Sequence, residues 1–256
     1  NMRLDKLLAN LGYGSRREIA LLAQAGRFLL DGERLARVDE RIALEPDLPT
    51  RLTYDGEELD PLPGCVLMMH KPLGVTCSHK EAGTRVYSLL PDRWQLRDPP
   101  FSTVGRLDKE TSGLLLITDD GAFLHNVISP KRNIAKRYRA TLDRPLRGDE
   151  AKIFGGGTMM LESEKTPLLP AGLEILSERE AVVTVTEGRY HQVRRMFAAV
   201  GNHVTALRFL EHLLALKTPQ NRARIKHCKK YFRPPDTLPI FFLCALEENI
   251  SEPTNK

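Results

Sequence analysis

The chain has 256 residues, 41% of them hydrophobic and 28% charged, and its 38 Lys and Arg exceed its 33 Asp and Glu to give a net charge of +5. This length allows one large domain or two small ones, and the hydrophobic content excludes wholesale disorder. No apolar run approaches the roughly 18 residues of a membrane span, and four scattered cysteines fit a reducing compartment, so we expect a cytoplasmic protein without a membrane segment.

Two short helices and a hairpin are predicted for residues 3–35. Leucines recur at the spacing of one helical face within residues 3–11: Leu4, Leu7, Leu8 and Leu11. A second helix is expected after Ser15, because Ser15 and Glu18 have the spacing of a capping box and Gly26 has the position of a C-terminal cap. The Asp31-Gly32 pair then favours a tight hairpin turn.

The same segment is mildly basic and resembles a known RNA-binding module. The string RLDKLLANLGYGSRREIALLAQAGRFLLDGE, residues 3–33, is similar to the alpha-L module of a ribosomal protein and several RNA-modifying enzymes. In that family the basic start of the second helix faces the RNA backbone. The resemblance implies RNA contacts from Arg3, Lys6, Arg16, Arg17 and Arg27, and the alternative is a solvated helical hairpin.

Residues 60–64, DPLPG, are predicted to be a linker, because two prolines and a glycine interrupt both helices and strands. The first domain is therefore expected at residues 1–60. The second domain, from residue 61 to residue 207, shows more strand patterns than helix patterns. Strands are predicted within residues 65–70, 114–118, 136–142 and 182–186, and a helix within residues 191–200. This pattern predicts an α+β domain with a mainly antiparallel sheet.

The most specific segment of the second domain is GRLDKETSGLLLITDDG, residues 105–121. It resembles the signature of the pseudouridine synthases, in the branch that contains the small-subunit ribosomal RNA enzyme RsuA. Three further stretches resemble motifs of that family in the same order: KPLG at 71–74, KRY at 136–138 and EGRYHQVRRMFAAVGNHV at 187–204. The resemblance covers residues 3 to about 207.

The resemblance implies that Asp108 is the catalytic carboxylate. Forming pseudouridine breaks a carbon–nitrogen bond and joins the uracil to ribose through carbon, and Asp108 would either attack the nucleotide or remove a ribose proton. A carboxylate that loses water on substrate binding needs a cationic partner, and Arg194 is the candidate, or Arg195 if the register differs by one residue. No cofactor motif is present, and the spacing of the histidines and cysteines predicts no metal site.

Other site residues follow from the same motifs. Tyr138 is implied to stack on the uracil and to accept a proton late in the reaction, or else it is an ordinary strand tyrosine. Leu207 matches the apolar residue beside that ring, although core packing explains it equally well. Because the base must leave its stack, Arg106 would fill the space left behind or contact a phosphate. The remaining substrate-binding candidates are Arg189, Gln192 and Arg195.

The C-terminal segment 208–256 does not resemble the family. Its basic and apolar stretches lack helical or strand periodicity, and three explanations are open: a divergent extension, an added RNA-binding tail, or a shifted reading frame, which the abrupt change favours. Loss of the usual terminus would leave the sheet without an edge strand.

The sequence therefore predicts a pseudouridine synthase that acts as a monomer on small-subunit ribosomal RNA or an assembly intermediate of it. His191 within GRYHQVRRMF favours the small-subunit type. Two alternatives are a sister enzyme acting on large-subunit RNA and a catalytically silent RNA-binding protein of ribosome assembly. Asp108, Tyr138 and Arg194 occurring together argue against the silent protein.

Overall fold

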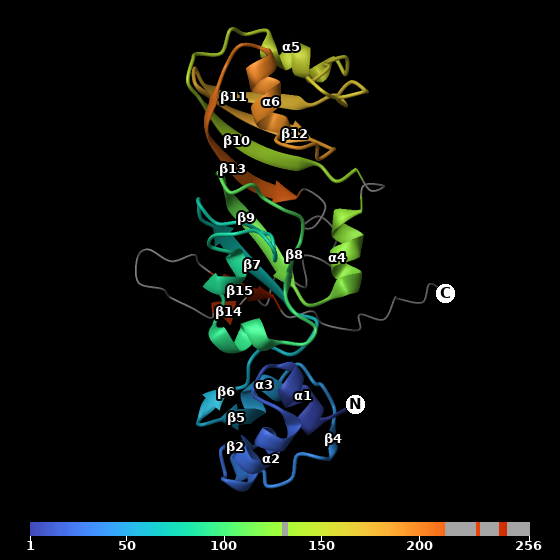
Figure 1. The fold of residues 1–256 in the computed structure, drawn as a ribbon, viewed down its shortest axis with the longest axis vertical. Helices are drawn as coiled ribbons and strands as arrows, with labels where there is room; N and C mark the ends of the chain where they lie inside the picture. Colours follow the sequence, from blue (N-terminus) through green and yellow to red (C-terminus); the bar gives the residue numbers. More distant parts are fainter. Residues whose placement is uncertain (130–132, 213–228, 231–240, 245–256) are drawn as a thin grey trace, which may run out of the picture.

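A computed structural model describes residues 1–129, 133–212, 229–230 and 241–244. They form an elongated molecule with a small N-terminal module at one end and a long sheet that runs through the rest (Figure 1). The predicted α+β class is confirmed. No helix in the described ranges is long and apolar enough to cross a membrane.

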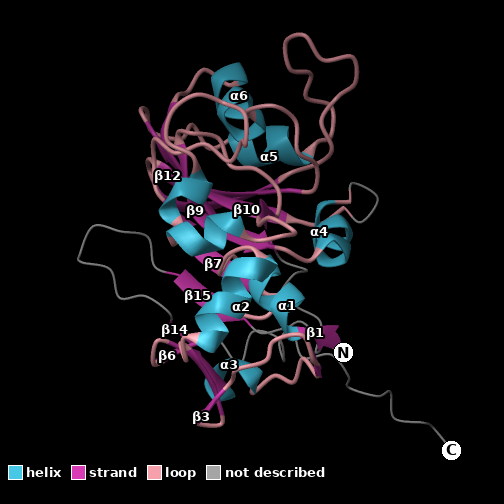
Figure 2. Cartoon of the chain, turned by 60° about the horizontal axis from the view of Figure 1, so that its bottom comes forward, coloured by secondary structure: helices cyan, strands magenta, loops and turns pink. Residues whose placement is uncertain are grey.

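The N-terminal module contains the two predicted helices and the hairpin. Its elements are β1 (Met2–Arg3), α1 (Leu4–Asn10), α2 (Arg16–Gln24), β2 (Phe28–Leu30), β3 (Glu33–Arg34), β4 (Arg41–Ile42), α3 (Leu48–Arg51), β5 (Leu52–Tyr54) and β6 (Glu57–Glu58). Strands β3, β2, β5 and β6 form one sheet, and β1 pairs with β4. Figure 2 brings this end of the molecule forward and shows α1 beside α2.

Local sequence signals account for the module. The Ser15 hydroxyl accepts a hydrogen bond from the Glu18 N–H while the Glu18 carboxylate accepts from the Ser15 N–H, which confirms the capping box. Asp31 and Gly32 both have positive φ, as the predicted hairpin turn requires. The four leucines of the first helical pattern are all buried in the module core.

Residues 60–64, the predicted linker, lie between the module and the larger domain. They form no helix or strand, as expected, but Asp60 is buried and its carboxylate accepts a hydrogen bond from Arg93 Nε at 2.5 Å. The Arg93 guanidinium lies 4.2 Å from the centre of the Tyr13 ring in the module. The backbone N–H of Asp60 donates to the Tyr13 hydroxyl at 3.0 Å. The segment is therefore a structured junction that ties the module to the larger domain.

The larger domain is built on a nine-stranded sheet in the order β11-β12-β10-β13-β9-β7-β15-β14, with β8 paired to β9. The strands are β7 (Val66–Lys71), β8 (Ser102–Thr103), β9 (Thr111–Thr118), β10 (Lys136–Leu142), β11 (Gly172–Ser177), β12 (Glu180–Val185), β13 (Val204–His212), β14 (Lys229–Lys230) and β15 (Phe241–Cys244). The helices are η1 (Val86–Leu89), η2 (Asp92–Leu96), α4 (Gly121–Ile128), α5 (Glu150–Gly155) and α6 (Gln192–Ala199).

Strands β9 and β13 form a seam between the two halves of this sheet. They run parallel, whereas every other pairing among the described strands is antiparallel. At Gly113 the two backbones approach so closely that a Cβ atom would lie 2.1 Å from the carbonyl oxygen of Phe209. Gly113 also has φ +121°, so the seam requires glycine at this position.

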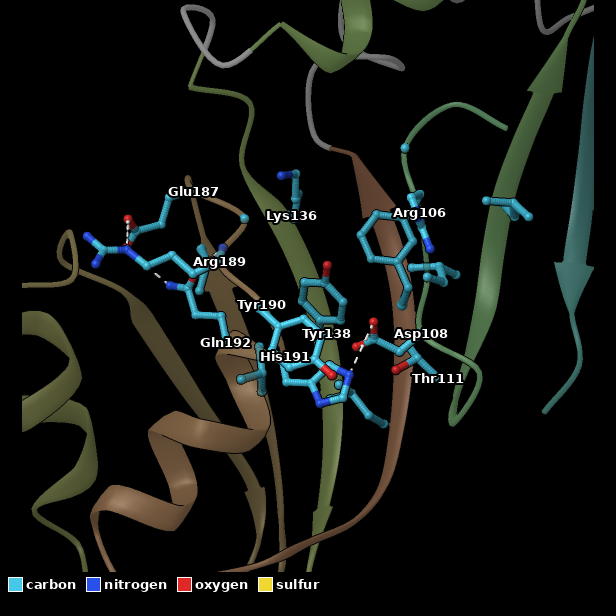
Figure 3. Close-up of a pocket in the computed structure, with 18 of the residues that line it drawn as sticks. Arg106, Asp108, Thr111, Lys136, Tyr138, Glu187, Arg189, Tyr190, His191 and Gln192 are labelled. Atoms are coloured by element: carbon cyan, nitrogen blue, oxygen red, sulfur yellow. Dashed lines mark hydrogen bonds and ion pairs between the residues drawn. The ribbon is translucent and has the colours of Figure 1, made fainter. Parts of the chain in front are cut away.

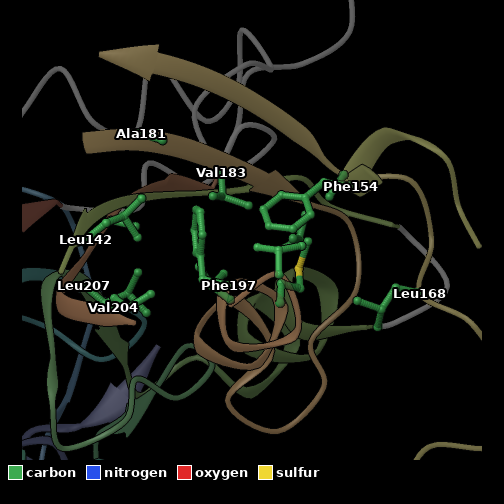
Figure 4. Packing of buried hydrophobic residues seen from close by; sticks show 14 of the residues in the cluster. Leu142, Phe154, Leu168, Ala181, Val183, Phe197, Val204 and Leu207 are labelled. Carbon is green, nitrogen blue, oxygen red and sulfur yellow. The ribbon is translucent and has the colours of Figure 1, made fainter. Parts of the chain in front are cut away.

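Separate hydrophobic clusters cover the two halves. Helices α5 and α6 cover the β10–β13 half, where the ring of Phe197 meets that of Phe154 edge-on at 5.1 Å (Figure 4). The β7–β9 half packs against η1 and η2 through one cluster and against α4 through another. Tyr138 packs against clusters of both halves, so its ring lies where they meet.

The described part of the C-terminal segment continues the sheet. Strand β13 extends to His212, past the predicted domain end at residue 207. Strand β15 pairs antiparallel with β7, from Phe241↔Met69 to Cys244↔Val66. The sheet was expected to lack an edge strand. This is wrong, because β15 pairs with the side of β7 that faces away from β9. The other residues of the predicted tail lie outside the described residues.

Candidate active site

A pocket of about 570 Å³ opens beside the seam between the two halves of the sheet. Its walls come from the 104–108 loop, the starts of β9 and β10, the 187–193 segment leading into α6, and β13. Figure 3 shows Asp108 and Thr111 on one side of Tyr138, with Tyr190 and His191 across from Asp108. Segments far apart in the sequence therefore meet here because their strands are neighbours in the sheet.

Backbone hydrogen bonds position the loop that carries Asp108. The Thr111 N–H donates to the Asp108 carbonyl at 3.0 Å, and the Gly74 N–H of the KPLG turn donates to the Lys109 carbonyl at 2.9 Å. The Leu107 N–H donates to the Cys77 sulfur at 3.5 Å. The Asp108 side chain is 38% exposed. The loop is fixed while its carboxylate stays accessible to a ligand in the pocket.

His191 is the ion-pair partner of Asp108 among the described residues. Its Nε2 lies 3.5 Å from Asp108 Oδ1, and the pair is an ion pair only when the ring is protonated. His191 precedes α6 with φ +46°, a conformation that is uncommon outside glycine. Its ring stacks on that of Tyr190 at 3.9 Å, and Tyr190 is 75% exposed. In the sequence, His191 indicated only the type of substrate, and no motif predicted this contact.

A buried lysine adds positive charge beneath the site. Lys71 ends β7 fully buried, and its ammonium donates to the carbonyls of Pro72 at 2.8 Å and Val75 at 2.7 Å. Burial lowers the pKa of Lys71, while the nearby charges of Cys77, Glu110 and Asp108 act in the opposite direction. In the sequence the KPLG motif indicates only a family resemblance, and no periodicity distinguishes a buried lysine from an exposed one.

Tyr138 lies at the centre of the pocket, on β10. Its ring meets that of Phe209 edge-on at 5.0 Å. Burial, reinforced by the charge of Asp108, raises the pKa of Tyr138 to about 12, so at neutral pH it is a phenol and not a phenolate. Leu207 of β13 is buried and lines the same pocket.

Arg194 does not form the predicted ion pair with Asp108. Its guanidinium donates instead to the backbone carbonyls of Glu110 at 2.9 Å and Val204 at 3.0 Å. The reason is its place on α6, which directs it to the backbone of the Asp108 loop and not to the carboxylate. Arg195 donates to Glu164, to the Tyr190 carbonyl and to the Glu162 carbonyl, and it lines no part of this pocket.

The other predicted substrate contacts line the pocket. Arg106 is exposed and pairs with Glu81 at 2.7 Å. Arg189 pairs with Glu187 at 3.0 Å and Glu164 at 3.1 Å. The buried Gln192 accepts a hydrogen bond from the Arg189 N–H and donates to Glu187. The same carboxylates that order Arg189 therefore neutralise part of its charge.

The side chains predicted to contact RNA are all exposed, and they differ in whether they form ion pairs. Three arginines make ion pairs: Arg3 and Arg16 with Asp5, and Arg27 with Asp55. For Lys6 and Arg17 the described part of the chain shows no ion pair. The same part shows no group of three His, Cys, Asp or Glu side chains that could hold a metal ion.

The comparisons with known proteins agree with this architecture. The model of the RNA pseudouridylate synthase family matches residues 65–199, and that of the S4 domain matches residues 2–44. A ribosomal small subunit pseudouridine synthase A from Vibrio cholerae is 40% identical over 206 residues, covering 80% of this chain and 86% of that protein. The protein of the same name from Escherichia coli is 39% identical, covering 80% and 87%.

A crystal structure of a pseudouridylate synthase is similar with a TM-score of 0.54 and 31% identity, covering 82% of this chain and 88% of that one. The fold and the matched segments thus define a two-part RNA-binding protein with an S4 domain in front of a synthase domain. The chain belongs to the RNA pseudouridylate synthase family.

Proposed function

We propose that this protein converts one uridine of small-subunit ribosomal RNA to pseudouridine, with Asp108 as the catalytic carboxylate. The observation that carries the proposal is the pocket at the seam, where Asp108 and the Tyr138 ring line one space. The names of the Vibrio cholerae and Escherichia coli relatives support the choice of small-subunit RNA.

In the proposed reaction Asp108 acts on the ribose of a uridine that has left its stack. Asp108 either attacks the sugar carbon of the glycosidic bond and is displaced again when the new bond forms, or takes a ribose proton and later returns it. The carbon–nitrogen bond breaks, the uracil turns, and the sugar carbon bonds to C5 of the uracil, which loses its proton while the freed ring nitrogen gains one. The ring of Tyr138 stacks on the uracil, and its high pKa makes proton acceptance by a free phenolate unimportant at neutral pH. His191 Nε2 lies 3.5 Å from Asp108 Oδ1, and the buried Lys71 ends the neighbouring strand β7.

The remaining residues position and bind. Arg194 is a positioning residue, because it ties α6 to the loop of Asp108 through the Glu110 carbonyl. Arg106 at the open side fills the space left by the base or contacts a phosphate. The exposed cations of the S4 module bind RNA backbone at a distance from the pocket, so a single chain contacts its RNA at two places. We infer that it works as a monomer in the cytosol.

The test compares the wild-type protein with Asp108→Asn on small- and large-subunit ribosomal RNA, mapping pseudouridine by carbodiimide-dependent stops of reverse transcription. We expect one stop in small-subunit RNA and a fall of at least about 10³-fold in rate for Asp108→Asn, with RNA binding retained. Asp143→Asn is the matched control, since Asp143 is an exposed turn residue outside the pocket.

Three results would contradict parts of the proposal. A stop that survives Asp108→Asn would exclude Asp108 as the catalytic group. A stop in large-subunit RNA alone would assign the sister activity. A folded wild-type protein that binds RNA and gives no stop would identify a silent RNA-binding protein.

A further inference from the structure

A second hollow of about 430 Å³ lies next to the pocket of Asp108. The C-terminal end of α4 forms one wall with Val127, Ile128 and Ser129, and residues 186–189 form the opposite one. Five residues line both spaces: Gly105, Lys136, Glu187, Gly188 and Arg189. Because the two hollows share a wall, an RNA strand with one nucleotide in the Asp108 pocket can place the adjacent nucleotide in the second hollow.

Lys136 marks the boundary between the two spaces. It is the first residue of β10, and Figure 3 shows it beyond Tyr138 as seen from Asp108, between Glu187 and Arg106. Its ammonium lies against Gly188, where a Cβ atom would come within 3.0 Å of Nζ. Burial lowers the pKa of Lys136.

Glu187 lines the same boundary as Lys136, but no ion pair joins the two among the described residues. Within the described ranges, no carboxylate lies within ion-pair distance of its ammonium. Glu187, which lines both spaces, is already paired with Arg189 and accepts further hydrogen bonds from the Leu169 N–H and from Gln192. A partly desolvated cation without a partner is unfavourable, and an anion placed here would remove that cost.

The walls of the second hollow suit a nucleotide. Val127, Ile128 and Ile134 give an apolar surface, and Ile128 is 48% exposed. Ser129, Asn133 and Thr186 bring polar groups to its edge. The volume lies within the range of small-molecule sites.

We propose that this hollow binds the nucleotide adjacent to the modified uridine, with the phosphate between the two nucleotides held by the Lys136 ammonium. The inference rests on the proposed function, because it takes the neighbouring pocket as the site of the target uridine. Turning a base out of its stack also displaces its flanking phosphates, which costs free energy. A fixed cation at the boundary offsets part of this cost by binding one of the displaced phosphates. Lys136 is thus a substrate-positioning residue that selects backbone geometry, and the apolar wall contacts the neighbouring base.

The first experiment measures binding of small-subunit RNA over a range of salt concentrations for wild-type protein and Lys136→Met. We expect Lys136→Met to weaken binding about 10-fold and to lower the slope of log K against log salt by about one. Lys136→Arg keeps the charge and should retain most of the affinity. Lys152→Met removes a lysine from the exposed side of α5 and should leave both quantities unchanged.

The second experiment locates the phosphate. Short RNAs spanning the mapped stop carry one uncharged methylphosphonate linkage at each position around the target uridine. In the wild type, one linkage next to the target should raise KM about 10-fold, and in Lys136→Met the same linkage should have no further effect, since the partner is already missing.

The inference is overturned if Lys136→Met binds like the wild type, or if every methylphosphonate has equal effects on both proteins. Failure of the proposed function looks different. In that case wild-type protein gives no stop, while the salt dependence on full-length small-subunit RNA still decides whether Lys136 contacts a phosphate. Thermal unfolding of each variant shows that it is folded.

Discussion

The N-terminal module and the synthase domain differ in how far apart in sequence their defining contacts lie. In the module, the capping box of Ser15 and Glu18 and the turn at Asp31 join residues at most three positions apart. In the synthase domain, the pocket joins Asp108 to His191 and Tyr138 through the pairing of three strands. Local signals therefore specify the helix start and the hairpin turn of the module, although its strands also pair over longer distances, as Phe28 does with Tyr54. The site depends entirely on the sheet being assembled correctly.

The two regions also use arginine differently. In the module Arg3, Arg16 and Arg27 are exposed and each pairs with one carboxylate, so each can exchange that partner for an RNA phosphate. In the synthase domain Arg194 and Arg195 donate to backbone carbonyls of other segments. We therefore propose that arginines of the module bind RNA, whereas Arg194 and Arg195 cross-link segments of the synthase domain.

The largest effect is expected from Gly113→Ala, which acts on the seam. A Cβ atom would overlap the Phe209 carbonyl and would occupy a backbone conformation of φ +121°, so the strands would have to separate. We expect a loss of about 3 kcal/mol or more in the free energy of unfolding, and loss of modification activity because the Asp108 loop leads directly into β9. Chemical denaturation and the modification assay measure the two effects.

Gly148→Ala is the control for backbone strain alone, because Gly148 has φ +103° and open space around its Cβ position. It should cost about 1 kcal/mol and leave activity unchanged. Equal costs for the two variants would show that the seam tolerates a side chain.

The next largest effect is expected at Arg194. The test distinguishes a role in positioning the Asp108 loop from a role in stabilising the charge of the Asp108 carboxylate. Arg194→Lys keeps the charge but cannot make both backbone hydrogen bonds to Glu110 and Val204, so we expect kcat to fall about 10- to 100-fold. The acid limb of the pH–rate profile should stay in place, because Arg194 does not contact the Asp108 carboxylate. Arg195→Lys, which alters contacts outside the pocket, should lower kcat much less.

A different result would support the ion pair between Arg194 and Asp108 that the sequence predicted. If Arg194 stabilised the charged carboxylate when substrate is bound, Arg194→Met would move the acid limb to higher pH and Arg194→Lys would move it back. A profile that shifts in this way contradicts the positioning role.

The sequence predicted the segments of the synthase domain well. The strand at residues 136–142 has the predicted bounds, the last helix begins within one residue of its predicted start, and Asp108 and Tyr138 line one pocket. These predictions depended on motifs and on local periodicity, which are properties of short segments.

The sequence did not predict the contacts between segments. Three features depend on which strands pair and in what register: the contact of His191 with Asp108, the backbone contacts of Arg194 and the burial of Lys71. Asp60 was assigned to a linker because prolines around it interrupt regular structure, but irregular backbone can still be buried when another segment supplies its partners. Here Arg93 does so from 33 residues away.

The smallest of these effects tests the module and its buried carboxylate. Asp5 accepts hydrogen bonds from Arg3 and Arg16, and these partners lower its pKa to about 2. A folded-state pKa below the unfolded value of 3.8 means that the charged carboxylate stabilises the fold above about pH 4 and loses this effect as the pH falls to about 2.

Asp5→Asn should therefore lower the stability of the module by up to about 2 kcal/mol at pH 7, and the difference from wild type should vanish near pH 2. Thermal unfolding of both proteins across this range measures it. Asp39→Asn removes an exposed partner of Arg37 and should cost much less at every pH, because solvent screens that pair. A difference between Asp5→Asn and wild type that stayed constant down to pH 2 would mean that packing of the side chain, and not its charge, stabilises the start of the module.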